Sequence, residues 1–108
     1  MSKRNDLQLL EDMIESSERI LLYTKGLDAL DDPMVCDAVA RNLEIIGEAA
    51  NRLSEDFKAH HSAVKWNEIR GFRNRLVHEY FGVDFQLVWV VVRNEIPQLL
   101  SQLRAWRG

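Results

Sequence analysis

Hydrophobic positions recur along this chain at steps of three and four residues, which is the spacing of an amphipathic helix. The spacing predicts a first helix over residues 6–28 and a second over residues 31–53. Asp32-Pro33 suits the start of the second, because a carboxylate can cap a helix and proline fits a first turn that needs no free N–H. Two long consecutive helices indicate an antiparallel hairpin. The inward residues are Leu10, Met13, Ser17, Ile20, Thr24 and Leu27 in the first helix, and Val39, Leu43, Ile46, Ala50 and Leu53 in the second.

The second half of the chain predicts two further helices. Residues 54–65 show no sustained period and form a connection with room for a short helical turn. Asn67 can cap a short third helix that ends near Gly82. A last helix follows a cap at Asp84, and Pro97 should kink or break it because proline lacks a backbone N–H. The predicted fold class is all-α, an up-and-down bundle of four or five helices.

Composition limits the kind of protein this can be. A chain of 108 residues, 46% hydrophobic and 29% charged, is typical of a soluble globule with one domain over residues 1–108. A single cysteine, Cys36, excludes an internal disulfide and makes a reducing cytoplasm the simplest compartment. The longest wholly apolar run, residues 87–92, is too short to span a membrane, and we expect no membrane contact.

Charge places any contact with nucleic acid in one region. A net charge of -3 argues against a protein that coats a polyanion through its overall field. Residues 65–75 nevertheless hold Lys65, Arg70, Arg73 and Arg75 with one acid, Glu68. This stretch is therefore the candidate contact for RNA phosphates.

Residues 70–80 add an amide, an imidazole and a phenol to these cations. Asn74 and His78 share a helical face, whereas Arg73 and His78 are five positions apart and about 140° from each other on an ideal helix. Either the helix loosens near His78, or a two-fold axis brings Arg73 of one subunit near His78 of the other. We favour the homodimer.

Arg73 and His78 suit the cleavage of RNA without a metal. This reaction needs a base for the ribose 2′-OH proton, an acid for the leaving oxygen and a cation over the phosphate. Imidazole has an ordinary pKa of about 6.5, so two copies in a dimer could divide the acid and base roles. A histidine near a helix end also commonly does no more than bind the last carbonyls, so composition alone leaves both interpretations open.

The spacing Arg73, four residues, His78, one residue, Tyr80 resembles the Arg-x4-His-x-Tyr signature of HEPN-domain ribonuclease toxins of the HepT group. The likeness covers most of the chain. Further matching segments are residues 41–50 in the second helix, Trp66 before the third, and residues 80–84.

The resemblance implies a HEPN-like helical homodimer and a metal-independent endoribonuclease, the toxin of a type II toxin-antitoxin system. Arg73 and His78 would be catalytic, and Asn74 would help hold the phosphate or the active geometry. The cluster of cations described above, and not the resemblance, predicts that Lys65, Arg70 and Arg75 assist RNA binding. The implied partner is an MNT-type nucleotidyltransferase antitoxin that transfers AMP to Tyr80, where added phosphates would repel RNA. No cofactor is expected. An alternative is a catalytically idle subunit that binds nucleotide or substrate for a nucleotidyltransferase complex, and a third is pure structural dimerisation.

Several other residues have simple structural interpretations. His60 and His61 lack the further ligands of a metal site, and we expect no metal. Glu44 and Glu48 are predicted to be surface carboxylates paired with arginines at positions 41 or 52. Cys36 reads as a small buried hydrophobe. The three tryptophans, Trp66, Trp89 and Trp106, are predicted to pack in the core or an interface.

Overall fold

The computed structural model describes residues 4–78 and 84–107, apart from the side chains at positions 77 and 78. This part of the chain forms six helices and no strand, which confirms the all-α class. The structure has more helices than the four or five predicted, for two reasons. The short helical turn expected before the third predicted helix is a separate helix, and the last predicted helix is divided into two. The helices are α1 (Asp6–Tyr23), α2 (Pro33–Arg52), α3 (Glu55–His60), α4 (Trp66–His78), α5 (Phe85–Asn94) and α6 (Ile96–Arg107).

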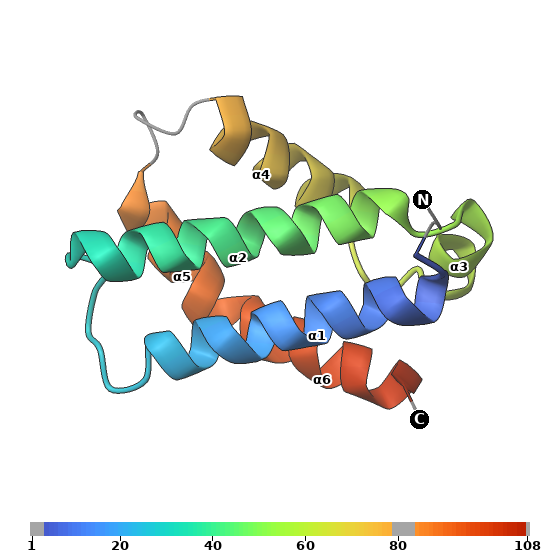
Figure 1. Cartoon of the computed structure of the whole chain (residues 1–108), viewed down its shortest axis with the longest axis horizontal. Coiled ribbons are helices and arrows are strands. Elements are labelled where there is room, and N and C mark those ends of the chain that lie inside the picture. The colour runs from blue at the N-terminus through green and yellow to red at the C-terminus, as the bar shows by residue number, and fades with distance from the viewer. Residues whose placement is uncertain (1–3, 79–83, 108) are drawn as a thin grey trace.

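The two long helices α1 and α2 lie side by side and run in opposite directions, which confirms the predicted hairpin (Figure 1). α6 packs against α1, and α4 packs against α2 on the side away from α1 (Figure 1). α5 leads directly into α6. The candidate motif therefore lies on an outer helix whose main neighbour is α2.

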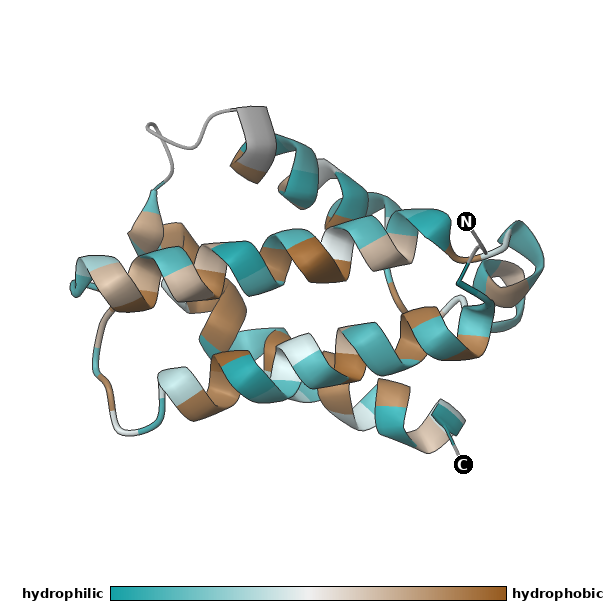
Figure 2. Cartoon of the chain, in the orientation of Figure 1, coloured by the Kyte–Doolittle hydropathy of each residue, from teal (hydrophilic) through white to brown (hydrophobic). Residues whose placement is uncertain are grey.

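The core lies where the apolar stripes of α1, α2 and α6 meet. Hydrophobic and hydrophilic residues alternate along these helices, as amphipathic helices require (Figure 2). Met13, Ile20, Val39 and Leu103 are completely buried. All five inward residues predicted for α2 are buried as well.

Two polar members of the α1 stripe are buried without losing hydrogen bonds. The Ser17 hydroxyl donates to the Met13 carbonyl at 2.8 Å, and the Thr24 hydroxyl donates to the Ile20 carbonyl at 2.7 Å. Bonding to the carbonyl four residues earlier satisfies each hydroxyl inside the core. These residues could therefore take part in a hydrophobic stripe, as predicted.

Side-chain caps begin two of the helices as predicted. The Asp32 carboxylate accepts a hydrogen bond from the Met34 N–H at 2.9 Å, and Pro33 opens α2. The Asp84 carboxylate accepts from the Gln86 N–H at 2.9 Å at the start of α5. Both starts follow from the short carboxylate side chain, which reaches an N–H with no partner inside the helix.

The helix ends agree with prediction at one place and differ at another. The break before Pro97 is confirmed, since α5 ends at Asn94 and α6 begins at Ile96. The first helix ends at Tyr23, five residues before the predicted end at position 28. The chain turns at Gly26, whose φ of 78° is readily adopted by glycine and ends the helix although the apolar spacing continues.

An aromatic cluster holds the start of α4 against α3 and α6. The rings of Phe57 and His61 are stacked with centroids 4.1 Å apart, and the Trp106 ring lies 4.2 Å from that of His61. The Trp66 indole N–H donates to the His61 carbonyl at 3.1 Å. Trp66 and Trp106 thus pack as predicted, and α4 begins at Trp66, one residue before the predicted cap.

No helix among the residues that the structure describes is long and apolar enough to cross a membrane.

Candidate functional site

α4 carries most of the candidate residues and is helical through His78. The loosening considered as one way to bring Arg73 and His78 together is therefore not seen in the backbone up to that position. Five positions on a regular helix turn a side chain by about 140°. The His78 side chain and Tyr80 lie outside the described residues, so their predicted roles stay predictions.

Arg73 is the central described residue of the candidate site. Its side chain is half-buried, and its stem lies directly over Gly47 of α2. Nη1 donates to the Asn74 Oδ1 atom at 3.4 Å, a long and therefore weak hydrogen bond. Nε is buried and has no hydrogen-bond partner within the described part of the chain.

An arginine with unused donors has a clear chemical use. The guanidinium has five N–H donors in a planar fork that matches the oxygens of a phosphate. The buried Nε cannot be reached by a ligand, so an incoming anion would meet the two Nη groups, where the bond from Nη1 to Asn74 is long and easily exchanged for one to a charged acceptor. Arg73 is therefore suited to bind an anionic oxygen, and the exposed Asn74 side chain adds an amide beside it.

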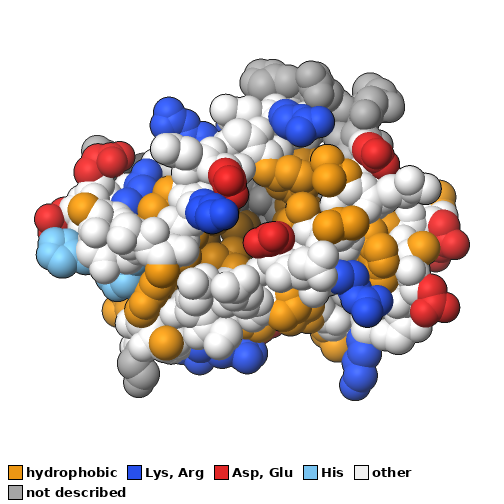
Figure 3. All heavy atoms as spheres, turned by 180° about the vertical axis from the view of Figure 1, so that it is seen from behind, with side chains coloured by type: hydrophobic (Ala, Val, Ile, Leu, Met, Phe, Trp, Pro, Cys, Tyr) orange, Lys and Arg blue, Asp and Glu red, His pale blue; other side chains and the backbone are white. Residues whose placement is uncertain are grey.

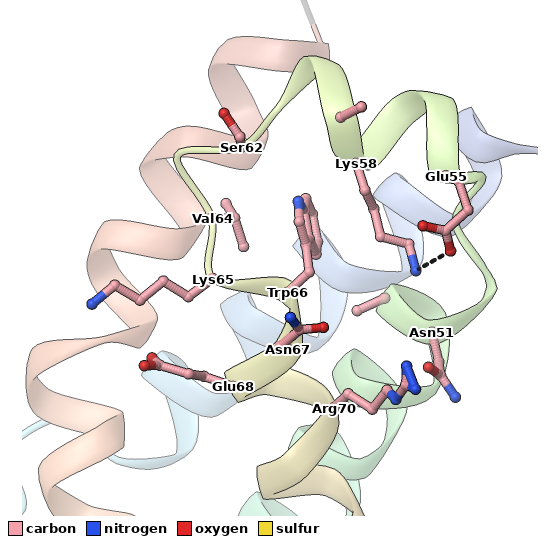
Figure 4. A pocket seen from close by; sticks show the side chains of 12 residues that line it. Asn51, Glu55, Lys58, Ser62, Val64, Lys65, Trp66, Asn67, Glu68 and Arg70 are labelled. Carbon is pink, nitrogen blue, oxygen red and sulfur yellow. Dashed lines mark ion pairs between the residues drawn. The ribbon is translucent and has the colours of Figure 1, made fainter.

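A cavity of about 540 Å³ lies at the start of α4, between α2, α3 and the loop before α4 (Figure 4). Arg70 and Asn51 lie next to each other at its edge (Figure 4). Lys58 also lines the cavity, but its Nζ is 3.5 Å from Glu55 Oε1. Arg70 is exposed and has no acidic group within 4.0 Å in the described part of the chain, so its charge is available for an anion.

The predicted cationic residues do not all meet on one side of α4. Arg70 and Arg73 are three positions apart and so are neighbours on the helix surface. Lys65 and Glu68 extend away from Arg70 (Figure 4). The structure therefore joins Arg70, Arg73 and Asn74 into one candidate phosphate-binding face, and it places Lys65 outside that face. Arg75 is exposed.

A second cavity, of about 510 Å³, is largely apolar and lies between α2, α4 and the α5–α6 pair. Hydrophobic side chains gather around a hollow on this side of the molecule, with charged groups at its edge (Figure 3). Ile69, Phe72 and Leu99 contribute to its lining. These side chains offer no group for acid-base chemistry.

The two histidines before α4 bind backbone carbonyls. His60 Nδ1 lies 2.8 Å from the Asp56 carbonyl oxygen, and His61 Nδ1 lies 2.8 Å from that of Phe57. Among the described residues no group of three His, Cys, Asp or Glu side chains could hold a metal ion. Glu44 pairs with Arg41 at 3.6 Å, which confirms that surface ion pair.

Cys36 is buried, as predicted. Burial raises the pKa of its thiol, and the negative charges of Asp37, Asp32 and Asp31 raise it further. A thiol in this state is a poor nucleophile. Cys36 is therefore a structural residue.

Gly47 is the residue that our sequence analysis did not connect with the site. A glycine in the interior of a helix lowers helix stability by about 1 kcal/mol relative to alanine, and this cost is the only signal that one sequence gives. Residues 47 and 73 are far apart in the sequence, so only the packing of α4 on α2 reveals their contact.

Together these features describe an all-helical protein with a candidate phosphate-binding face on one outer helix. Comparison with known proteins then gives the family. Residues 11–106 match the family described as Ribonuclease HepT-like, and the chain belongs to this family.

Individual relatives agree with this assignment. The chain is 41% identical over 98 residues to "Putative RNase TTE0752" of Caldanaerobacter subterraneus subsp. tengcongensis, covering 88% of each chain. It is 38% identical over 106 residues to "Putative RNase MJ1380" of Methanocaldococcus jannaschii, covering 95% of this chain and 97% of the relative. It is 39% identical over 108 residues to "Probable ribonuclease HepT" of Thermococcus cleftensis, covering 97% and 98%. No solved structure matches the chain.

Proposed function

We propose that this protein is a metal-independent endoribonuclease and the toxin of a type II toxin-antitoxin system. The observation that carries the proposal is Arg73: in a chain of the HepT-like ribonuclease family, this arginine lies at the centre of the motif with only a long hydrogen bond, to Asn74, on its Nη groups within the described part of the chain. Arg70 and Asn74 on the same face support the binding of RNA phosphates.

The proposed reaction is attack of a ribose 2′ oxygen on the adjacent phosphorus. His78 of one subunit takes the proton from the 2′-OH, the new P–O bond closes a 2′,3′-cyclic phosphate, and the bond to the 5′ oxygen breaks. Water gives a proton to that leaving oxygen, so each site uses one His78 and one Arg73. Arg73 stabilises the negative charge that grows on the phosphoryl oxygens.

The proposal includes a homodimer, because Arg73 and His78 occupy positions five residues apart on α4, and five steps on a regular helix separate two positions by about 140°. A two-fold axis between two α4 helices would allow Arg73 of one subunit to meet His78 of the other. The site would then be incomplete without the second copy.

Mixing two inactive variants tests this arrangement. After subunit exchange between Arg73→Ala and His78→Ala proteins, about half of the dimers are mixed, and each mixed dimer has one intact site if the residues meet across the axis. We expect about a quarter of the wild-type rate to return. If both residues acted within one subunit, no activity would return.

Cleavage of a labelled single-stranded RNA of mixed sequence in EDTA tests the chemistry. We expect the wild-type protein to cut, and Arg73→Ala and His78→Ala to lose at least about a hundredfold in rate, the size typical of removing an acid-base or oxyanion group. Matched controls are Arg104→Ala and His60→Ala on α6 and α3, which should cut normally. Cutting that vanishes in EDTA and persists in His78→Ala would contradict the proposal.

The proposed partner is a nucleotidyltransferase antitoxin that transfers AMP to Tyr80. Incubation with such an enzyme and labelled ATP should label the wild-type chain and leave Tyr80→Phe unlabelled, and labelling should stop RNA cleavage. A chain that binds the nucleotidyltransferase but never cuts RNA, and that is indifferent to Arg73→Ala, would instead be the idle subunit.

A further inference from the structure

Gly47 lies where Arg73 of α4 comes into direct contact with the α2 backbone. It is buried in the middle of α2, and a Cβ atom added to it would overlap both Cβ and Cγ of Arg73 and come within 3.5 Å of the Arg73 Cα. Gly71 on α4, which is exposed, has nothing within 4 Å of the same added atom. Of these two helical glycines, only Gly47 lies where a neighbouring helix leaves no room for a side chain.

The overlap cannot be relieved by a change of side-chain rotamer. The Arg73 Cβ is bonded to the backbone, so its position is set by where α4 lies. Any side chain at position 47 would push this part of α4 away from α2 or rotate it. Because α4 packs chiefly against α2 among the described helices, no other contact of similar extent would resist that shift.

This close approach also limits where the Arg73 guanidinium can point. The stem lies on the α2 backbone, Nε is buried, and Nη1 is directed to the Asn74 side chain. A group held in this way needs little rearrangement to meet charge that develops on a phosphate. Displacement of the stem by a methyl group would misdirect the donors without removing the charge.

We propose that Gly47 is a positioning residue. Because Gly47 has no side chain, the Arg73 stem can lie directly on α2, and this contact, the seating of Arg73, fixes the position of the guanidinium. The catalytic consequence rests on the proposed function, whereas the seating itself does not. Two measurements therefore test the inference separately.

The first measurement is a double-mutant cycle on stability, read as urea midpoints by circular dichroism. Gly71→Ala, the matched control, should raise the midpoint, because alanine favours a helix and the position is open. Gly47→Ala should lower it. In an Arg73→Gly background, which removes both overlapping atoms, Gly47→Ala should no longer lower the midpoint. An equal loss in both backgrounds would overturn the proposed contact.

The second measurement separates binding from cleavage. We expect folded Gly47→Ala to cut RNA at least about tenfold more slowly, since a displacement of about 1 Å can cost up to a hundredfold. Its affinity for a fully 2′-O-methylated RNA, which binds but cannot be cut, should change less than about threefold, since the charge of Arg73 remains. Gly71→Ala should match the wild type in both.

The outcomes separate the inference from the proposed function. A Gly47→Ala protein that cuts at the wild-type rate overturns the positioning role, as does one that loses binding and cleavage equally. A wild-type protein that never cuts RNA defeats the proposed function, and the stability cycle still decides whether Gly47 seats Arg73.

Discussion

The charge of Arg70 should be measurable in the salt dependence of RNA binding. Arg70 is exposed at the edge of the cavity at the start of α4, with no acidic group within 4.0 Å in the described part of the chain. Lys58 lines the same cavity, but Glu55 lies 3.5 Å away. Arg104 on α6 is bound to Glu18 at 2.7 Å. Only Arg70 among these three cations is therefore available to replace a counterion on RNA.

The expected size follows from counterion release. Each phosphate contact contributes about -0.7 to the slope of log affinity against log salt concentration for a single strand. Arg70→Gln should make this slope shallower by about 0.7, or by about 1.4 if RNA contacts both subunits of a dimer. Between 50 and 200 mM salt, the loss of affinity should be smaller by a factor of about 2.6 for each contact removed.

Fluorescence anisotropy with the 2′-O-methylated RNA gives these slopes without cleavage. Lys58→Gln and Arg104→Gln are matched controls that remove one charge, and their slopes should equal that of the wild type. An unchanged slope in Arg70→Gln would refute the assignment of Arg70 to RNA binding. An equal change in Lys58→Gln would refute the reasoning from ion pairing.

Three further predictions concern the scaffold. Leu103→Ala should lower the free energy of unfolding by about 2–5 kcal/mol in urea titrations, because Leu103 is 0% exposed and alanine would leave a cavity. The Ser54 hydroxyl and N–H donate to the Asp6 carboxylate and lower its pKa from the ordinary 3.8. The stabilisation is therefore present above pH 3.8 and is lost as the pH falls through the lowered pKa, so acid titration should remove the advantage of the wild type over Asp6→Ala. Iodoacetamide should modify Cys36 much more slowly in the native protein than in urea, since the thiol is buried and its pKa is raised.

Helix boundaries could be predicted where a local side chain or ring determines them. Asp32 and Asp84 cap their helices through bonds that span two residues, and Pro97 interrupts the last helix through its own missing N–H. The end of α1 was predicted too late because Thr24 and residue 27 continue the apolar spacing. The conformation of Gly26 ends the helix, and spacing alone does not report it.

The sequence indicated which segment holds the candidate residues, but not how their side chains are placed in space. The density of cations in residues 65–75 pointed to the segment that forms α4, which carries Arg70, Arg73 and Asn74. The structure nevertheless directs Lys65 away from Arg70, since Lys65 lies in the loop before α4 and Arg70 lies on the helix itself (Figure 4). The contact between Gly47 and Arg73 depends on how two helices pack, and one sequence holds no record of that packing.

The arrangement of the helices separates stability from the chemistry of the site. α1, α2 and α6 share the buried core, whereas α4 packs chiefly against α2. Leu103→Ala acts in the core and should lower stability while the folded fraction cuts RNA at the normal rate. Gly47→Ala acts where α4 meets α2, so its cost should fall more heavily on kcat than on folding. The contrary result is that both variants lose stability and kcat in the same proportion. The position of α4 would then depend on the whole core, and the contact between Gly47 and Arg73 would have no effect of its own on the reaction.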